Sequence, residues 1–273
     1  MGYKITEKNN LNPSNVLIKV LAPAVAAKAK AGQFVIVRPF SDSERIPLTI
    51  SDYKAATGEV ALIFAPIGET TAELNSLKTG DEICDVCGPL GNPTEICGKN
   101  IVVVGGGVAC GIALPVAKEA KSSGAKVTAV MGFRTKDLVI LEDEFRAVCD
   151  EVIVTTGDGS YGICGSVLDP LGSVLKNLPD EVFAVGTLGM MKGVSALTKP
   201  FGVKTIVSMN PIMIDGTGMC GGCRLRVGGE MKFACVDGPD FDGHLVDFDS
   251  LMKANARFSE FEHKRKETCN LFK

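Results

Sequence analysis

The sequence lacks the features that mark membrane, secreted and nucleic-acid-binding proteins. Its longest apolar runs, such as residues 101–104 and 182–185, are the size of single strands and far short of a membrane span. Residues 1–11 are polar and have no apolar core of the kind found in a signal peptide. The net charge of −3 leaves no basic excess for nucleic acid. We therefore expect a cytoplasmic protein that binds neither nucleic acid nor a membrane.

Histidine is scarce in this chain, whereas cysteine is abundant. His244 and His263 are the two histidines, and we assign a role to neither; His263 stands in a charged run typical of a solvated surface. Ten cysteines are many for a chain without an export signal, and in a reducing cytosol thiols do not pair as disulfides. Three of them, Cys220, Cys223 and Cys235, fall close together, which indicates a metal site.

The spacing of apolar residues divides the 273-residue chain into four segments. Residues 1–97 hold short apolar or alternating runs separated by Gly and Pro, which predicts an antiparallel β-barrel. Residues 98–210 alternate strand and helix patterns, which predicts an α/β unit with a doubly wound parallel sheet. Residues 211–245 are rich in Gly and Cys, and residues 246–273 have the pattern of a charged helical tail.

Individual elements follow from the same patterns. In the barrel we expect strands at 16–20, 34–38, 48–51, 60–65 and 82–86, and a helix at 70–77 that a threonine caps. In the α/β unit we expect strands at 101–104, 126–131, 151–155, 182–185 and 205–209, and helices at 109–123, 142–148, 166–177 and 190–201.

The strongest chemical signal is the spacing Asp215-x4-Cys220-x2-Cys223-x11-Cys235. A plant-type [2Fe–2S] cluster takes ligands from C-x4-C-x2-C and a distant Cys, and Asp215 stands where the first Cys would be. Interleaved glycines would let backbone N–H groups point at the cluster sulfurs. A structural Cys3Asp zinc site and inert thiols are the alternatives. The glycines are Gly216, Gly218, Gly221 and Gly222.

Two glycine-bearing loops follow predicted parallel strands. The first is Gly105-Gly106-Gly107, where a helix start would present amides and a positive dipole end to a pyrophosphate; Cys110 replaces the third glycine of the dinucleotide motif. The second contains Gly186, Thr187 and Met190 and would face a nicotinamide ring, since ligands bind at the carboxyl ends of such strands. Tight strand–helix turns that bind no ligand are the alternative for both loops.

Two segments of the predicted barrel could hold a flavin. A flavin needs a strand edge against its ring and a cation near its diphosphate, which a basic strand and a helix start can supply. An ordinary barrel strand and turn are the alternative. The candidates are Arg45, Pro47, Leu48 and Thr49 in the first segment and Ala65, Gly68, Thr70 and Thr71 in the second.

In this order the motifs resemble those of the ferredoxin–NADP reductase superfamily, over nearly the whole chain. The branch with a C-terminal [2Fe–2S] segment is the most similar. Within it, the single Asp ligand resembles the small-subunit family of NADH-dependent reduced ferredoxin:NADP oxidoreductases, also known as sulfide dehydrogenases. The electron-transfer subunits of dihydroorotate dehydrogenase B are close relatives that carry four cysteines. The chain departs from the superfamily pattern R-x-Y-S/T, because Pro47 replaces the tyrosine and Arg45 lies one residue further from Thr49.

The resemblance implies one FAD, one [2Fe–2S] cluster and a nicotinamide nucleotide. It also implies a larger partner subunit with flavin and [4Fe–4S] clusters, reduction of ferredoxin through the complex, and electron bifurcation. We expect NAD(H), as in both related families, although Arg134 and Lys136 beyond the second strand would suit a 2′-phosphate unless they pair with Asp137 or Glu142. An electron donor to a dihydroorotate-oxidising subunit and a cofactor-binding module without turnover are the rival functions.

Overall fold

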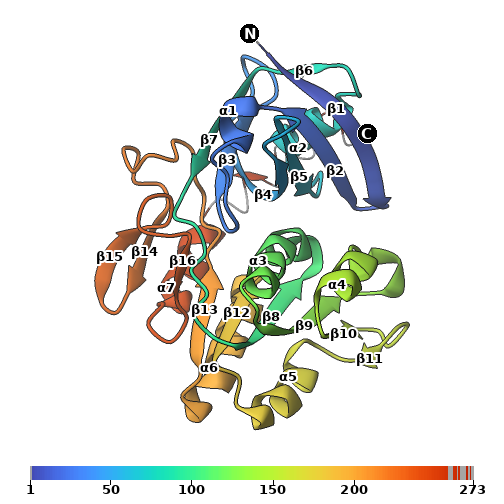
Figure 1. Cartoon of the computed structure of the whole chain (residues 1–273). Helices are drawn as coiled ribbons and strands as arrows, with labels where there is room; N and C mark the ends of the chain where they lie inside the picture. The colour runs from blue at the N-terminus through green and yellow to red at the C-terminus, as the bar shows by residue number, and fades with distance from the viewer. Residues whose placement is uncertain (1, 258–260, 263, 265–268, 270, 272–273) are drawn as a thin grey trace.

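A computed structural model describes residues 2–257, 261–262, 264, 269 and 271. A β-barrel lies above an α/β unit, with the Gly- and Cys-rich segment at one side (Figure 1). The barrel is a seven-stranded sheet in the order β6-β1-β2-β5-β4-β3-β7, and its neighbouring strands pair antiparallel. Its elements are β1 (Tyr3–Asn12), β2 (Asn15–Leu21), α1 (Pro23–Ala26), β3 (Phe34–Arg38), β4 (Ile46–Lys54), β5 (Glu59–Phe64), α2 (Glu69–Ser76), β6 (Glu82–Ile83) and β7 (Asp85–Leu90).

Alternating side chains fill the barrel. Ile18, Ile50 and Leu62 from three neighbouring strands are fully buried, as is Leu74 of α2. This alternation confirms the predicted antiparallel barrel. The strand β1 is absent from the expected strands because its sequence is mostly polar; Ile5 is its fully buried residue. The predicted strand 82–86 is two short strands, β6 and β7.

The second unit is a seven-stranded sheet in the order β11-β10-β9-β8-β12-β13-β16. Its strands run parallel except β16, which pairs antiparallel with β13. This confirms the α/β prediction. The strands are β8 (Asn100–Gly106), β9 (Lys126–Phe133), β10 (Glu151–Thr156), β11 (Ile163–Cys164), β12 (Glu181–Val185), β13 (Lys204–Ser208) and β16 (Asp240–Asp242). The helices are η1 (Gly107–Ala109), α3 (Cys110–Ser122), η2 (Lys136–Leu138), α4 (Glu142–Val148), α5 (Leu168–Val174), η3 (Leu175–Asn177), α6 (Leu188–Thr198) and η4 (Lys199–Phe201).

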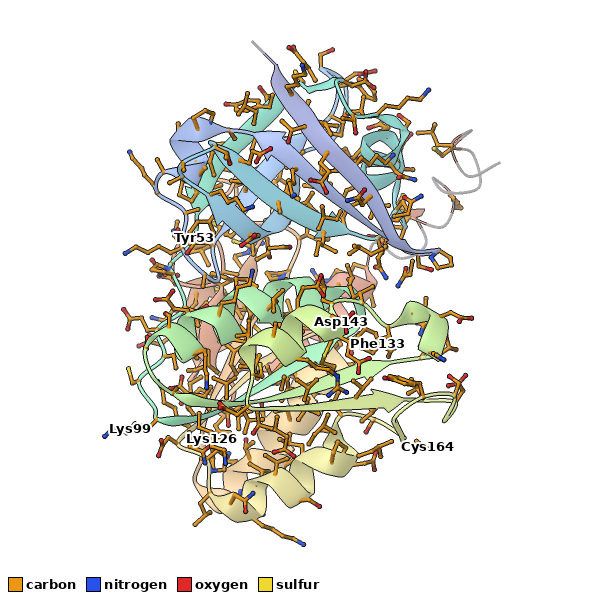
Figure 2. The ribbon with its side chains drawn as sticks, turned by 45° about the vertical axis from the view of Figure 1, so that its right-hand side comes forward. Tyr53, Lys99, Lys126, Phe133, Asp143 and Cys164 are labelled. Carbon is orange, nitrogen blue, oxygen red and sulfur yellow. The ribbon has the colours of Figure 1, made fainter. Side chains whose placement is uncertain are left out.

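Helices cover both faces of this sheet. The helices α3 and α4 lie on the face toward the barrel, and α5 and α6 lie on the opposite face (Figure 1). The helices predicted at 166–177 and 190–201 each end in a tighter 3₁₀ turn, η3 and η4, after which Leu178 and Gly202 take left-handed backbone angles. Figure 2 shows the two ends of the parallel strands. Lys99 and Lys126 lie at the amino ends, and Phe133 and Cys164 lie at the carboxyl ends.

The cysteine-rich segment is partly built into the sheet. It forms the hairpin β14 (Arg224–Val227) and β15 (Glu230–Phe233) and then adds β16 to the edge of the sheet. The described part of the predicted helical tail contains α7 (Phe248–Ala256). The remainder of the predicted tail, His263 included, lies largely outside the described residues. None of the helices in the described part of the chain has the length and apolar character that a bilayer span requires.

Direct contacts join the barrel to the α/β unit. Gly111 of α3 lies against the barrel, where an added Cβ would be 3.0 Å from Ile63. Lys118 of the same helix forms an ion pair of 3.3 Å with Asp52. The side-chain amide of Asn12 donates to the backbone carbonyl of Leu138 at 3.0 Å. The carboxyl ends of β8 and β12 are thereby held beneath the barrel.

Candidate cofactor sites

The two glycine loops of the α/β unit meet at one place. Strand order reverses between β8 and β12, and Gly105 pairs with Val185 across that boundary. A Cβ on Gly106 would lie 2.7 Å from the Met190 sulfur and 3.6 Å from the Cα of Gly186. In open α/β sheets, ligands bind at such a switch point, outside the carboxyl ends of the strands. The structure thus joins two segments that are about 80 residues apart in sequence.

The first loop has open space in front of it. Gly107 has a φ of +58°, which favours glycine, and no atom lies within 4 Å of where its Cβ would be. Cys110, which replaces the third glycine of the motif, is buried, and burial raises the pKa of its thiol far above the ordinary value. Its sulfur would touch a Cβ on Gly105 at 3.0 Å. Cys110 therefore packs the strand–helix turn as an apolar residue.

The second loop opens α6 toward the same place. Thr187 is the N-cap, and its hydroxyl accepts a hydrogen bond from the amide of Met190 at 3.3 Å. Gly186 is buried, whereas Thr187 is exposed. Capping accounts for the threonine without a ligand. Met190 packs over Gly106 and Gly186, so one side chain contacts both glycine loops.

The basic residues beyond β9 differ in their surroundings. Arg134 is exposed. The backbone amide of Lys136 donates to the Ser160 hydroxyl at 2.8 Å, and its ammonium lies 5.6 Å from the centre of the Tyr161 ring. Glu142, which we considered as a partner for either cation, pairs with Arg146 and accepts from the Tyr161 hydroxyl.

The sequence did not single out the Asp158–Tyr161 loop, although its Ser160 and Tyr161 side chains contact Lys136. Its Thr-Gly-Asp-Gly-Ser pattern after the third parallel strand, at residues 156–160, was the available signal.

In the barrel, the start of α2 leaves room for a ligand. The helix begins at Glu69 with Gly68 as N-cap, whose amide donates to the Thr71 hydroxyl at 2.9 Å. The threonine cap expected at Thr70 is wrong, because Thr70 is buried inside the first turn. Gly68 has an ordinary φ of −117°, and a Cβ there would approach only Thr71, at 3.9 Å. Neither strain nor packing requires this glycine, so close approach of a diphosphate is the requirement that its position fits.

The strand expected against the flavin ring is β4. Pro47, Leu48 and Thr49 are all only half-buried, and they pair with Ile36, Val35 and Phe34 of β3. Ala65 directly follows the neighbouring strand β5. A strand with three successive half-buried residues departs from the usual alternation of buried and exposed residues, which means that neither of its faces is fully covered by the protein.

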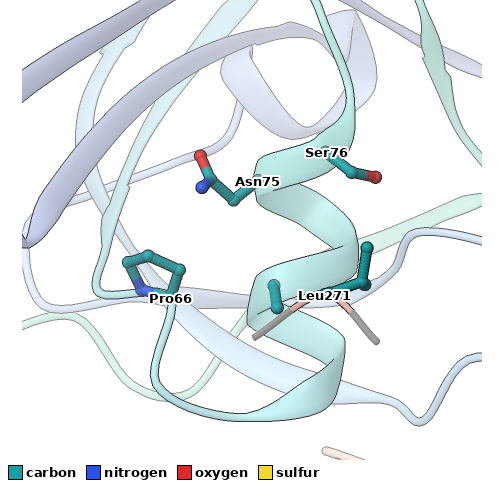
Figure 3. Close-up of a pocket in the computed structure, with 5 residues that line it drawn as sticks. Pro66, Asn75, Ser76 and Leu271 are labelled. Carbon is teal, nitrogen blue, oxygen red and sulfur yellow. The ribbon is translucent and has the colours of Figure 1, made fainter. Parts of the chain in front are cut away.

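Arg45 contacts the cysteine-rich segment, which the sequence did not predict. Its Nε donates to the carbonyl of Ile214 at 3.0 Å. The contact of Arg45 with a flavin diphosphate stays a prediction. A hollow of about 310 Å³ on the α2 side of the barrel contains none of the predicted site residues. Figure 3 shows Asn75 and Ser76 of α2 facing it, with Pro66 and Leu271 beside them.

The predicted cluster ligands lie on one loop and the hairpin that follows it. The sulfurs of Cys223 and Cys235 are 3.3 Å apart and both residues are buried. Burial and the neighbouring Cys223 raise the pKa of the Cys235 thiol to about 11. Two cysteine sulfurs bound to one tetrahedral metal ion, each with a bond of about 2.3 Å, lie only slightly further apart than the Cys223 and Cys235 sulfurs do here. A bound cation would compensate the cost of ionising this buried pair.

Of the other two predicted ligands, Cys220 is exposed and Asp215 is half-buried, and hydrogen bonds lower the pKa of both. The Gly222 amide donates to the Cys220 sulfur at 3.5 Å, and this bond, with those from the Asp215 and Ile214 amides, lowers the pKa of the Cys220 thiol. The Asp215 carboxylate accepts from the Thr217 hydroxyl at 2.7 Å, the Thr217 amide at 2.9 Å and the Met219 amide at 3.0 Å. These bonds, with a smaller contribution from the Arg45 charge, hold the pKa of Asp215 below its usual value.

Glycines give the ligand loop its shape. Gly216, Gly218 and Gly221 have φ of +83°, +88° and +65°, which other residues rarely adopt. Their turns bring backbone N–H groups to the sulfurs, including that of Gly218 to Cys235. A two-iron cluster takes two protein ligands on each iron, and the carboxylate and three thiols on this loop and hairpin are donors of that kind.

Comparison with known proteins finds relatives of the cysteine-rich segment and of the whole chain. Residues 210–247 match the iron–sulfur cluster binding domain of dihydroorotate dehydrogenase B. The chain is 46% identical to a Thermotoga maritima homologue of the dihydroorotate dehydrogenase B (NAD(+)) electron transfer subunit, over 88% of this chain and 86% of that protein. It is 36% identical to the Streptococcus thermophilus electron transfer subunit, over 81% and 89%.

Two solved structures have the same fold as this chain. One chain from the structure of NADH-dependent reduced ferredoxin-NADP oxidoreductase is 43% identical, with a TM-score of 0.92, over 98% of this chain and 97% of that one. The ferredoxin reductase of carbazole 1,9a-dioxygenase shares the fold at 19% identity, with a TM-score of 0.64 over 74% and 66%. The superfamily resemblance is thus confirmed. The chain belongs to the family of dihydroorotate dehydrogenase B electron-transfer subunits and their homologues, which are flavin- and iron–sulfur-dependent oxidoreductase subunits.

Proposed function

We propose that this chain is the electron-transfer subunit of an electron-bifurcating NADH-dependent reduced ferredoxin:NADP oxidoreductase. In this role it exchanges a hydride between NAD(H) and FAD and delivers single electrons to a larger subunit. The observation that carries the proposal is the ligand set: an ionised carboxylate, Asp215, in the first position of an otherwise cysteine set. The 43% identity to a bifurcating enzyme over almost the full chain supports it.

Each cofactor has a place in the proposal. FAD would lie on the barrel, NAD(H) at the switch point, and a [2Fe–2S] cluster on the loop of Asp215, Cys220, Cys223 and Cys235. When bound, these groups convert a two-electron hydride into single electrons. The barrel residues are Pro47, Leu48, Thr49, Ala65, Gly68, Thr70 and Thr71, and the NAD(H) residues are Gly105, Gly106, Gly107, Gly186, Thr187 and Met190.

For the nucleotide, NAD(H) is proposed over NADP(H). Arg134 and Lys136 beyond β9 are both exposed, and the Lys136 ammonium lies 5.6 Å from the centre of the Tyr161 ring. The test is the rate of flavin reduction in the isolated subunit with NADH and with NADPH. A faster rate with NADPH that Arg134→Ala abolishes would overturn the choice.

The partner is proposed to dock over the cluster loop. Met219 is 87% exposed there, and Ile212, Ile214 and Val236 around it are exposed as well. An apolar surface beside a metal site suits a protein partner, because burial of the patch excludes water and shortens the path for electrons. The larger subunit with flavin and [4Fe–4S] clusters is the proposed occupant, and ferredoxin is reduced through the complex.

A second function has its own support. The matching family and the names of the Thermotoga and Streptococcus relatives point to electron donation to a dihydroorotate-oxidising subunit. Reconstitution separates the two functions. Our proposal requires ferredoxin reduction by NADPH with the larger bifurcating subunit, whereas dihydroorotate-dependent NAD reduction with the other partner would replace it. A cofactor-binding module without turnover is excluded if NADH bleaches the flavin.

The first experiment is the cofactor content of the anaerobically purified protein. We expect two irons, two sulfides and one FAD per chain. Stoichiometric zinc without sulfide, or FMN alone, would contradict the proposal. The flavin is identified by releasing it with heat and comparing it with standards.

A further inference from the structure

One hydrogen bond joins the barrel directly to the cluster-ligand loop. Arg45 lies just before β4, and its Nε donates to the carbonyl of Ile214 at 3.0 Å, across 169 residues of sequence. That carbonyl belongs to the same peptide unit as the Asp215 amide. In a trans peptide the carbonyl and the N–H point in opposite directions, so a donor on one side orients the other.

The peptide unit that Arg45 holds belongs to a proposed cluster ligand. Its N–H is that of Asp215, whose carboxylate accepts from the Thr217 hydroxyl at 2.7 Å and from the Met219 amide at 3.0 Å. Arg45, the Ile214–Asp215 peptide and the Asp215 side chain therefore connect a permanent cation to the first ligand position. A charged donor on the carbonyl fixes and polarises the peptide from which the ligand extends.

We infer that Arg45 is a positioning residue of the [2Fe–2S] cluster, which it serves by holding and polarising the Ile214–Asp215 peptide. The inference rests on the proposed function, since it assumes that the loop holds the cluster. Hydrogen bonds to cluster sulfurs and nearby positive charge both stabilise the reduced, more negative state. Arg45 therefore raises the midpoint potential of the cluster.

The test uses the full-length protein purified anaerobically, with the variants Arg45→Gln and Arg45→Lys. Arg38→Gln is the matched control, because Arg38 is a barrel arginine that pairs with Asp85. Each protein is assayed for iron, sulfide and FAD, and its cluster is titrated potentiometrically with detection by electron paramagnetic resonance. In Arg45→Gln we expect full FAD and iron and a shift of roughly tenfold toward the oxidised cluster, about 59 mV for one electron. Arg45→Lys should shift less, and Arg38→Gln should match the wild type.

An unchanged potential in an Arg45→Gln protein with a full cluster would overturn the inference. Loss of FAD with an unchanged potential would instead assign Arg45 to the flavin. If Arg45→Gln loses iron but keeps FAD, and Arg45→Lys regains the iron, the positioning role stands. Loss of iron and FAD together from both variants would show a general folding role and overturn it. A wild-type protein without iron and sulfide is a different result, since it would refute the proposed function itself.

Discussion

At the scale of single residues, the four proposed cluster ligands differ in their surroundings. Cys223 and Cys235 form a buried pair, whereas Cys220 is exposed and Asp215 is half-buried, each with backbone amides directed at it. Burial raises the pKa of the Cys235 thiol to about 11, whereas hydrogen bonds lower the pKa of Cys220 and of Asp215. Binding of a metal would favour loss of protons from the thiols.

Asp215→Cys should keep the cluster but lower its midpoint potential. Thiolate donates more charge to ferric iron than carboxylate does, so we expect a shift of about tenfold or more toward the oxidised form. Potentiometric titration checks the shift, and iron analysis checks the loading. Asp215→Ala is the control, since it removes the ligand and should lose iron. A raised potential in Asp215→Cys would contradict the assignment of Asp215 as a ligand.

Gly68→Val should weaken FAD binding without harming the fold. The new side chain has open space in the protein, so it would occupy the volume that we assign to the diphosphate. We expect affinity to fall at least roughly tenfold, about 1.4 kcal/mol. Gly172→Val is the control, because it also adds a side chain in open space, on α5. Fluorescence titration of the apoprotein measures both, and equal FAD affinity in Gly68→Val and the wild type would remove Gly68 from the site.

At the scale of elements, the edge strand β16 fixes the cysteine-rich segment onto the α/β sheet. Its first residue, Asp240, is half-buried with its carboxyl Oδ1 enclosed, accepts a hydrogen bond of 2.5 Å from the Thr94 hydroxyl and bonds with Ser208. Burial raises the pKa of Asp240 to about 6, and nearby Glu181 contributes in the same direction. Thr94 lies in the link between the two units, so this carboxyl group joins the link, the sheet and the cluster segment.

The raised pKa of Asp240 makes its contribution to stability depend on pH. In the unfolded chain the group titrates near 3.8, so between that pH and about 6 the folded protein holds more protons than the unfolded one. Stability from this group is therefore present at low pH and lost as pH rises to about 6. Between pH 5 and 7.5 the loss is about 1.4 kcal/mol.

Asp240→Asn should remove this dependence. Relative to wild type, the unfolding temperature of the variant should rise between pH 5 and about pH 7 and then stay level, as anaerobic scanning calorimetry of the intact protein can show. Asp242→Asn, the same change at the end of the same strand, controls for the loss of a charge. A difference between Asp240→Asn and wild type that does not vary with pH would refute the prediction.

At the scale of the whole molecule, hydrogen bonds tie the cluster segment to the barrel side as well as to the sheet. Arg45 reaches Ile214 from the barrel, and Asn92 in the link donates its side-chain amide to the carbonyl of Val236 at 3.1 Å. The cluster loop therefore sits between the two units, at one side of the molecule (Figure 1). Its apolar residues Met219, Ile212, Ile214 and Val236 are exposed, which leaves the proposed partner surface open.

Met219→Glu should weaken assembly with the larger subunit and leave the cluster intact. The charge would have to be desolvated at the interface, which we expect to cost about 2 kcal/mol or more in binding. Leu178→Glu is the control; Leu178 is 65% exposed and follows η3 on the side of the sheet away from the barrel. Size-exclusion chromatography of the native complex and visible spectra check the two parts. Wild-type assembly of Met219→Glu would place the interface elsewhere.

The sequence by itself determined the features that depend on local spacing. The ligand set of Asp215 and three cysteines, the change from short alternating strands to βα repeats near residue 98, and most helix and strand positions all follow from neighbouring residues. These patterns are readable because amphipathic periods and ligand spacings act over a few residues. The polar strand β1 was not predicted, because backbone pairing with β2 and β6, rather than an apolar pattern, defines it.

Only the tertiary structure decided which distant segments meet. The packing of Met190 over both glycine loops depends on strand order, which no local pattern encodes. The addition of β16 to the sheet required the antiparallel pairing of residues about 35 positions apart. The hydrogen bond from Arg45 to the cluster loop depends on a carbonyl 169 residues away in sequence, whereas the contact of Arg45 with a flavin diphosphate stays a prediction. Composition predicts that such groups exist, but their meeting is a property of the packed chain.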